Sequence, residues 1–201
     1  FTDSDDSPQA HAAESFQYDV FLEAVKSIKS KVPVMLELGV SHIPVYSKLF
    51  NDMFDNNCVN ICTEVLESRL NIAKQKFPNG IFYQTYSGLP MHLREATPSG
   101  VEIESLCTIP FKTLLTQNNI EYVDILHVDI QGSEVSLLQE LNQEKLYEKI
   151  EWFFISIHDC YEECLDQIKD WDAKLIFAHP TLGGWGDGLI IIKNNTARTT
   201  H

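Results

Sequence analysis

Short apolar runs alternate along the chain with segments in which apolar residues recur every three or four positions. The runs have the length of buried β-strands, and the periodic segments have the spacing of helices that bury one face. The runs predict strands over residues 32–40, 59–64, 81–86, 122–130, 152–158, 173–178 and 188–193. The periodic segments predict helices over residues 15–30, 44–54, 66–77, 110–118, 133–141 and 160–171.

This order of elements predicts an α/β fold: a three-layer sandwich with a doubly wound, mostly parallel, seven-stranded sheet and helices on both faces. No helical spacing separates the strands expected at 173–178 and 188–193, so we expect the last strand to run antiparallel. The small and acidic residues 1–14 predict a disordered leader, and residues 15–201 predict a single domain that begins with a helix.

Charge and cysteine content narrow the classes of partner and compartment. The 201 residues carry a net charge of −14, which argues against a nucleic acid as the partner because phosphate binding needs clustered Lys and Arg. No apolar run approaches the roughly 20 residues that span a bilayer, so no membrane span is expected. The five cysteines favour reduced thiols and therefore a cytoplasmic location.

Candidate functional residues follow from the geometry of such a sheet. Ligands of open α/β sheets bind outside the carboxyl ends of the strands, where the strand order reverses. The expected strands end at Glu37 with Gly39, at Glu64, at Ser87, at Asp129, and at His158 with Asp159. We expect these ends to meet at one crevice, with Glu64 accepting hydrogen bonds from a ribose. The alternative is that Glu37 and Glu64 are solvated strand ends.

Four stretches of the sequence also resemble a known family. They are LELGV (36–40), NICTEV (60–65), VDILHVDIQGSEVSLLQEL (123–141) and FFISIHD (153–159), and together they resemble FkbM-type S-adenosylmethionine-dependent methyltransferases. The resemblance covers roughly residues 32–193 and is most specific after the fourth strand, where the family tends to show Asp-x-Glu-Gly-x-Glu. Asp129, Gly132 and Glu134 match this pattern, and Gln131 stands where Glu is usual.

The resemblance implies a Rossmann-like domain with S-adenosylmethionine as its cofactor. By this similarity Glu37 and Gly39 would lie beside the methionine part, Glu64 would hold the ribose and Ser87 would approach the adenine. Asp129 would lie at the boundary between cofactor and substrate, with His158 across the same crevice.

Transfer to a hydroxyl also requires removal of its proton. His158 is the candidate general base because imidazole titrates near neutral pH, and Asp129 would orient the acceptor or act as the base itself. The expected acceptor is a small molecule or a carbohydrate, selected by segments 87–107 and 180–188 and by the N-terminal helix. Alternatively, His158 is a strand-end residue that is hydrogen-bonded to a loop. Glu134 is read as a first-turn acid that complements the helix dipole.

Three other interpretations remain open at this point. The family's cofactor loop has a second glycine, which is absent from Val40-Ser41-His42-Ile43-Pro44, so a non-catalytic Rossmann-like binding domain is one alternative. An NAD-dependent oxidoreductase is another, weakened by the absence of G-x-G-x-x-G. Asp129, Glu134, His158 and Asp159 include suitable donors for Mg²⁺, but we predict no metal site.

Overall fold

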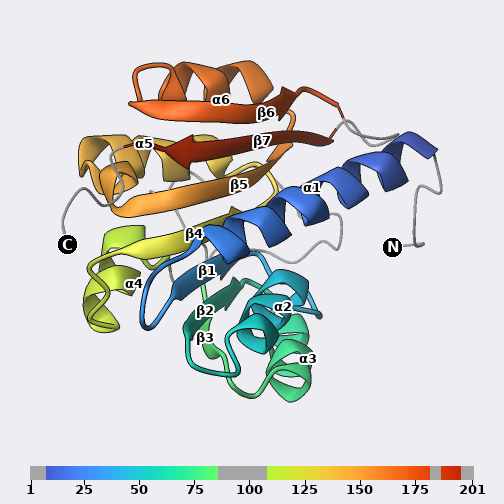
Figure 1. Cartoon of the computed structure of the whole chain (residues 1–201), viewed down its shortest axis with the longest axis vertical. Helices are drawn as coiled ribbons and strands as arrows, with labels where there is room; N and C mark the ends of the chain where they lie inside the picture. The colour runs from blue at the N-terminus through green and yellow to red at the C-terminus, as the bar shows by residue number, and fades with distance from the viewer. Residues whose placement is uncertain (1–7, 86–107, 182–186, 196–201) are drawn as a thin grey trace.

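The computed structural model describes residues 8–85, 108–181 and 187–195. Over these ranges the chain forms a seven-stranded sheet covered by helices on both faces (Figure 1), which confirms the predicted three-layer α/β fold. Ser87, predicted to approach the adenine, lies outside the described residues, as do the rest of segment 87–107 and residues 182–186.

The bounds of the elements follow the apolar pattern of the sequence closely. The strands are β1 (Val34–Leu38), β2 (Val59–Glu64), β3 (Ile81–Gln84), β4 (Val123–Val128), β5 (Ile150–His158), β6 (Ala173–His179) and β7 (Asp187–Asn194). The helices are α1 (Pro8–Ser27), α2 (Val45–Met53), α3 (Glu67–Lys76), α4 (Phe111–Gln117), α5 (Glu134–Gln143) and α6 (Tyr161–Ile168), with one 3-10 turn, η1 (Leu146–Lys149). Helix α1 starts at Pro8 rather than at residue 15, and η1 was not predicted.

The strands lie in the order β3-β2-β1-β4-β5-β7-β6. Strands β1 to β5 pair in parallel, and β7 pairs antiparallel with both β5 and β6. The antiparallel last strand is therefore confirmed. A parallel neighbour needs a crossover of a dozen or more residues, and the connection between β6 and β7 is too short for one. The strand order reverses between β1 and β4, which is where this class of sheet binds ligands.

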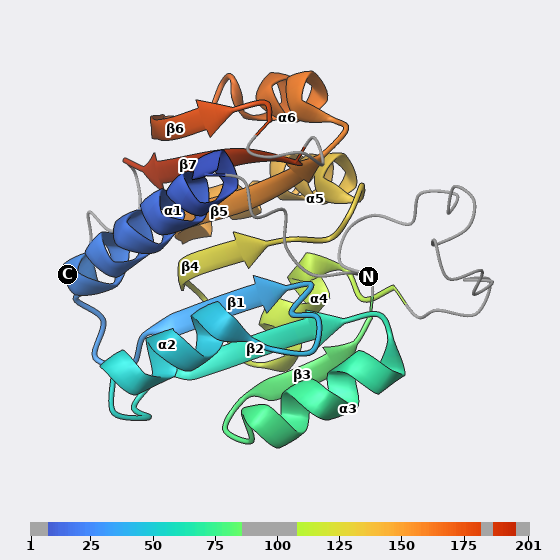
Figure 2. The same cartoon turned by 90° about the vertical axis from the view of Figure 1, so that its right-hand side faces the viewer.

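Each face of the sheet packs against its own set of helices. Phe21 of α1 and Phe50 of α2 are buried with Met35 of β1. On the other face, Leu36, the next residue of β1, is buried with Leu137 of α5. Successive side chains of a strand point to opposite faces, so burial on both sides explains why the central strands are apolar without alternation. Figure 2 shows α1, α2 and α3 on one side of the sheet and α5 and α6 beyond it.

Among the helices that the structure describes, none is both long enough and apolar enough to cross a membrane.

Candidate functional site

The loop after β1 is packed directly against the loop after β4. The amides of Gly39 and Val40 both donate to the carbonyl of Thr63, at 2.9 and 3.0 Å, and the amide of Asp129 donates to the carbonyl of Leu38 at 2.9 Å. Gly39 has a φ of 84°, and a Cβ on it would overlap the carbonyl oxygen of Asp129. Glycine is therefore required here by the approach of the two loops at the point where the strand order reverses.

Ser41 takes the backbone conformation that a second glycine would adopt easily. Its φ is 53°, in the left-handed region that non-glycine residues rarely occupy, and its Oγ lies 3.2 Å from Nδ1 of His42. The turn after β1 thus forms without a second glycine, although it places a side chain at residue 41.

Glu37 is a buried residue at the end of β1, with an exposed fraction of 3%. Its Oε2 accepts a hydrogen bond of 2.8 Å from the amide of Ser47, in the first turn of α2. Burial raises the pKa of the Glu37 carboxyl to about 7, against the lowering effect of the hydrogen bonds from Ser47, and the nearby charge of Asp129 raises it further. The interpretation of Glu37 as a solvated strand end is therefore wrong.

Glu64 is also buried, at 5% exposure, where β2 turns toward α3. Its Oε1 accepts hydrogen bonds from the amides of Val65 and Leu66, each at 3.0 Å. The solvated interpretation is wrong for this residue too. The two bonds hold the Glu64 carboxylate against the chain at the carboxyl end of β2, and they leave its orientation little freedom.

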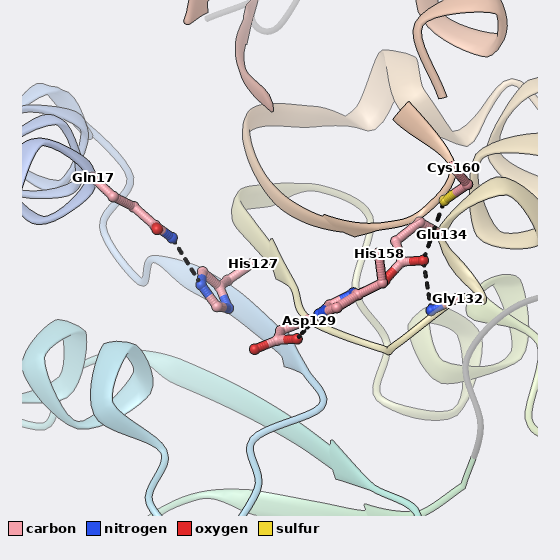
Figure 3. A network of polar contacts seen from close by, with 7 residues as sticks. All are labelled: Gln17, His127, Asp129, Gly132, Glu134, His158 and Cys160. Carbon is pink, nitrogen blue, oxygen red and sulfur yellow. Dashed lines mark hydrogen bonds and ion pairs between the residues drawn. The ribbon is translucent and has the colours of Figure 1, made fainter. Parts of the chain in front are cut away.

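His158 lies between two carboxylates at the carboxyl end of the sheet (Figure 3). Its Nδ1 is 2.7 Å from Oε1 of Glu134, and its Nε2 is 3.4 Å from Oδ1 of Asp129. The Glu134 side chain is fully buried, that of His158 is 18% exposed and that of Asp129 is 44% exposed. The three side chains thus run from the interior to the rim, and the predicted pair of Asp129 and His158 is brought together.

The role of Glu134 was missed at the level of sequence. Besides contacting His158, its Oε2 accepts a 2.8 Å hydrogen bond from the amide of Gly132 and lies 3.6 Å from Sγ of Cys160. Glu134 does lie in the first turn of α5, as predicted, but it is fully buried and contacts His158, so its position near the helix dipole does not describe all of its contacts. The helical spacing of the sequence could have predicted its burial, because Glu134 lies on the apolar face of its helix with Leu137, Leu138 and Leu141.

His127 of β4 is buried beneath α1. Its ring stacks on Tyr46 with centroids 4.3 Å apart, and its Nε2 lies 3.2 Å from Nε2 of Gln17. Burial lowers the pKa of His127 to about 3, so the ring is neutral at physiological pH. Nδ1 of His127 has no hydrogen-bond partner among the described residues.

Metal coordination finds no support in the part of the chain that the structure describes. Within it, no three His, Cys, Asp or Glu side chains are grouped in a way that could hold a metal ion. Both nitrogens of His158 face carboxylates instead. Asp159, the fourth candidate ligand, lies in the turn after β5 with a φ of 57°.

The strand order, the antiparallel β7 and the site at the β1–β4 reversal define the fold of class I S-adenosylmethionine-dependent methyltransferases. No protein-family model matches the sequence, and no curated protein matches it either. The similarity is to solved structures. One is TrmK of M. capricolum in complex with S-adenosylhomocysteine, at 12% identity and a TM-score of 0.54 over 90% of this chain and 71% of that one.

Two further structures show the same fold. The N-terminal domain of human METTL16 in complex with S-adenosylhomocysteine has 13% identity and a TM-score of 0.50, over 96% of this chain and 72% of that one. Sp1610 of Streptococcus pneumoniae in complex with S-adenosylmethionine has 9% identity and a TM-score of 0.50, over 90% of this chain and 75% of that one. At these identities the likeness is one of fold.

Proposed function

We propose that this chain is an S-adenosylmethionine-dependent O-methyltransferase of FkbM type that acts on a hydroxyl of a small molecule or carbohydrate. The observation that carries the proposal is the imidazole of His158 beside Asp129, at the carboxyl edge of a methyltransferase-type sheet. The solved structures named above include complexes with S-adenosylmethionine and its demethylated product, which supports this choice of cofactor.

The residues at the ends of β1 and β2 fit such a cofactor. Both hydrogen bonds of Glu64 to the main chain use Oε1, and we assign Oε2 to the ribose hydroxyls. The buried carboxyl of Glu37 anchors the start of α2 and so holds the Gly39 loop, where the methionine part would lie. Ser87, assigned to the adenine by resemblance, remains part of the proposal.

Methyl transfer requires the protein mainly to align the acceptor with the methyl group and to remove one proton from the acceptor. When bound, the sulfonium cofactor supplies the methyl group. His158 takes the proton of the acceptor hydroxyl, and Asp129, the more exposed of its two partners, orients that hydroxyl at the rim. The acidic edge of the sheet also favours a cation over a neutral product.

The charge of the chain bears on the acceptor. Sp1610 is named as a tRNA methyltransferase, and RNA binding relies on Lys and Arg beside the phosphates. This chain has 15 Lys and Arg against 29 Asp and Glu. We therefore favour a small molecule or a carbohydrate as the acceptor.

Titration calorimetry with S-adenosylmethionine, S-adenosylhomocysteine and NAD tests the proposal at its first step. We expect both methionine-derived ligands to bind and NAD not to bind. Absence of binding of all three at about 1 mM would leave a non-catalytic domain, and binding of NAD alone would indicate an oxidoreductase.

Mass spectrometry of small molecules that copurify with the chain gives a second test and guides the search for an acceptor. With an acceptor in hand, we expect His158→Gln to lose at least about 100-fold in the rate of transfer while it keeps cofactor affinity. Full activity in His158→Gln would refute the assignment of the base.

A further inference from the structure

We propose that Glu134 is a positioning residue that holds the neutral imidazole of His158 as its Nδ1–H tautomer and leaves Nε2 as the nitrogen that accepts a proton. The role of Nε2 in methyl transfer rests on the proposed function. The tautomer itself is a property of the folded chain and can be measured without any cofactor or acceptor.

The two sides of the imidazole are held very differently. Nδ1 and Oε1 of Glu134 are 2.7 Å apart, a strong hydrogen-bond distance, whereas Nε2 and Oδ1 of Asp129 are 3.4 Å apart. Glu134 is fully buried and Asp129 is 44% exposed. The buried hydrogen bond between Nδ1 and Glu134 is therefore the fixed one. The contact between Nε2 and Asp129 at the rim is the one that an acceptor hydroxyl can replace.

Both oxygens of Glu134 are placed to accept hydrogen bonds, and neither is placed to donate one. Oε2 faces two donors, the amide of Gly132 at 2.8 Å and the thiol of Cys160 at 3.6 Å. A proton on Oε2 would point toward these donors, so the carboxylate accepts there and also accepts from His158 at Oε1. Because the other nitrogen's hydrogen bond decides the tautomer of a histidine, this arrangement selects Nδ1–H.

In the proposed reaction, one proton moves from the acceptor hydroxyl to Nε2 of His158. The O–H bond of the acceptor breaks, its electron pair stays on the oxygen that is to be methylated, and an N–H bond forms at Nε2, which gives an imidazolium with a proton on each nitrogen. The buried carboxylate of Glu134 offsets the new positive charge through the Nδ1 hydrogen bond. Nε2 later returns its proton to water at the rim, since the Glu134 side of the ring is closed to solvent.

Glu134→Gln gives a sharp test because glutamine has only one acceptor oxygen. The amide of Gly132 belongs to the main chain and can only donate, so the glutamine oxygen has to face it. The glutamine NH₂ group then faces Nδ1 of His158, which becomes an acceptor. The substitution is nearly isosteric, yet it should invert the tautomer and place the proton on Nε2.

Glu140→Gln is a matched control on the same helix. Glu140 is also buried, at 3% exposure, and its Oε1 also accepts from a main-chain amide, that of Lys112 at 3.0 Å. This substitution removes a buried carboxylate from α5 but not the partner of His158, so the His158 tautomer should be unchanged.

Nitrogen-15 NMR of the histidine side chains measures the tautomer directly. The His158 signals are assigned by their absence from His158→Gln, and spectra are read at a pH where titration shows the ring to be neutral. We expect the unprotonated nitrogen to be Nε2 in the wild type and in Glu140→Gln, and Nδ1 in Glu134→Gln. An Nε2–H tautomer in the wild type, or the same tautomer in Glu134→Gln, would overturn the proposal.

Calorimetry and rate measurements separate this proposal from the proposed function. Glu134→Gln should bind S-adenosylmethionine as the wild type does and lose at least about 100-fold in transfer rate. If the wild type binds no S-adenosylmethionine, the proposed function fails while the NMR result still decides the tautomer. If transfer occurs and Glu134→Gln keeps the full rate, the role of Glu134 in positioning the base is refuted.

Discussion

Gly39 and Asp129 meet main chain to main chain at the point where the sheet reverses its strand order. The loop of β1 crosses so near that of β4 that a Cβ at residue 39 would overlap the Asp129 carbonyl oxygen. The predicted role of Asp129 at the crevice therefore depends on a glycine in the loop after a different strand. A single methyl group at residue 39 has to move the β4 loop, and with it the carboxylate of Asp129.

Gly39→Ala should accordingly destabilise the chain strongly. Gly132→Ala is the matched control, since Gly132 has a similar φ of 93° but nothing lies within 4 Å of a Cβ placed there. Both substitutions carry backbone strain of about 1–3 kcal/mol, and the steric overlap should cost Gly39→Ala roughly 2 kcal/mol more. Urea unfolding measures the difference, and equal losses would show that the loops adjust without cost.

Glu37 should make the folded state less stable as pH rises. Its pKa is raised from 4.5 to about 7, so the folded state keeps a proton that the unfolded state has lost. This contribution is fully present below about pH 4.5 and is lost as pH rises through about 7. We expect the free energy of unfolding of Glu37→Gln, relative to the wild type, to rise by roughly 2–3 kcal/mol between about pH 5 and pH 8.

Glu67→Gln, on the exposed first turn of α3, controls for removing one carboxylate. Urea unfolding at a series of pH values gives the curves. A pH-independent difference between Glu37→Gln and the wild type would contradict the raised pKa of Glu37.

His127 should have the opposite pH dependence. Burial lowers its pKa from 6.5 to about 3, so between these pH values the unfolded state binds a proton that the folded state does not bind. The stability that comes from the neutral ring is complete above about pH 6.5 and is lost as pH falls toward 3. As pH falls from about 7 to 4, the free energy of unfolding of His127→Phe should rise by roughly 2–3 kcal/mol relative to that of the wild type. This change with pH does not depend on how stable the variant is at neutral pH.

The control for His127 is His42→Gln, which removes an exposed imidazole instead. Because Glu37 and His127 oppose each other between about pH 4.5 and 6.5, the wild type should change little there on their account. Parallel pH profiles of His127→Phe and the wild type would refute the lowered pKa.

Glu64→Gln should weaken cofactor binding without unfolding the chain. The glutamine oxygen can still accept from the amides of Val65 and Leu66, but the NH₂ group replaces the oxygen that we assign to the ribose. Loss of a charged acceptor for a hydroxyl should raise the Kd for S-adenosylmethionine about tenfold or more. Calorimetry measures the Kd and thermal unfolding checks the fold; an unchanged Kd would remove Glu64 from the site.

The elements were predictable wherever burial imposes a period on the sequence. Strand β2 has the predicted bounds, and the ends of the other described strands lie within a few residues of the predicted ones. Helix α1 begins earlier than predicted because PQAHAAE has helix propensity and a Pro suited to a first turn, but no apolar period. The 3-10 turn η1 is a single turn, too short for any period.

The candidate site was predictable only in part. The rule that ligands bind at the carboxyl ends of parallel strands selects Asp129 and His158 from a large number of polar residues, and the structure brings these two together. The same rule does not reach Glu134, because it lies on the helix behind the strand. Nor does it show that Glu37 and Glu64 are buried and bonded to the main chain.

The sequence by itself determined the layers, the antiparallel last strand and the edge of the sheet at which the acids gather, since all three follow from local periodicity and the lengths of connections. Only the tertiary structure decided which donor each carboxylate contacts. Two of those contacts join different elements, Glu134 of α5 with His158 of β5 and Glu37 of β1 with Ser47 of α2, and they depend on packing distances within a few tenths of an ångström. The pKa values follow from the same packing, because burial depends on every neighbouring element at once.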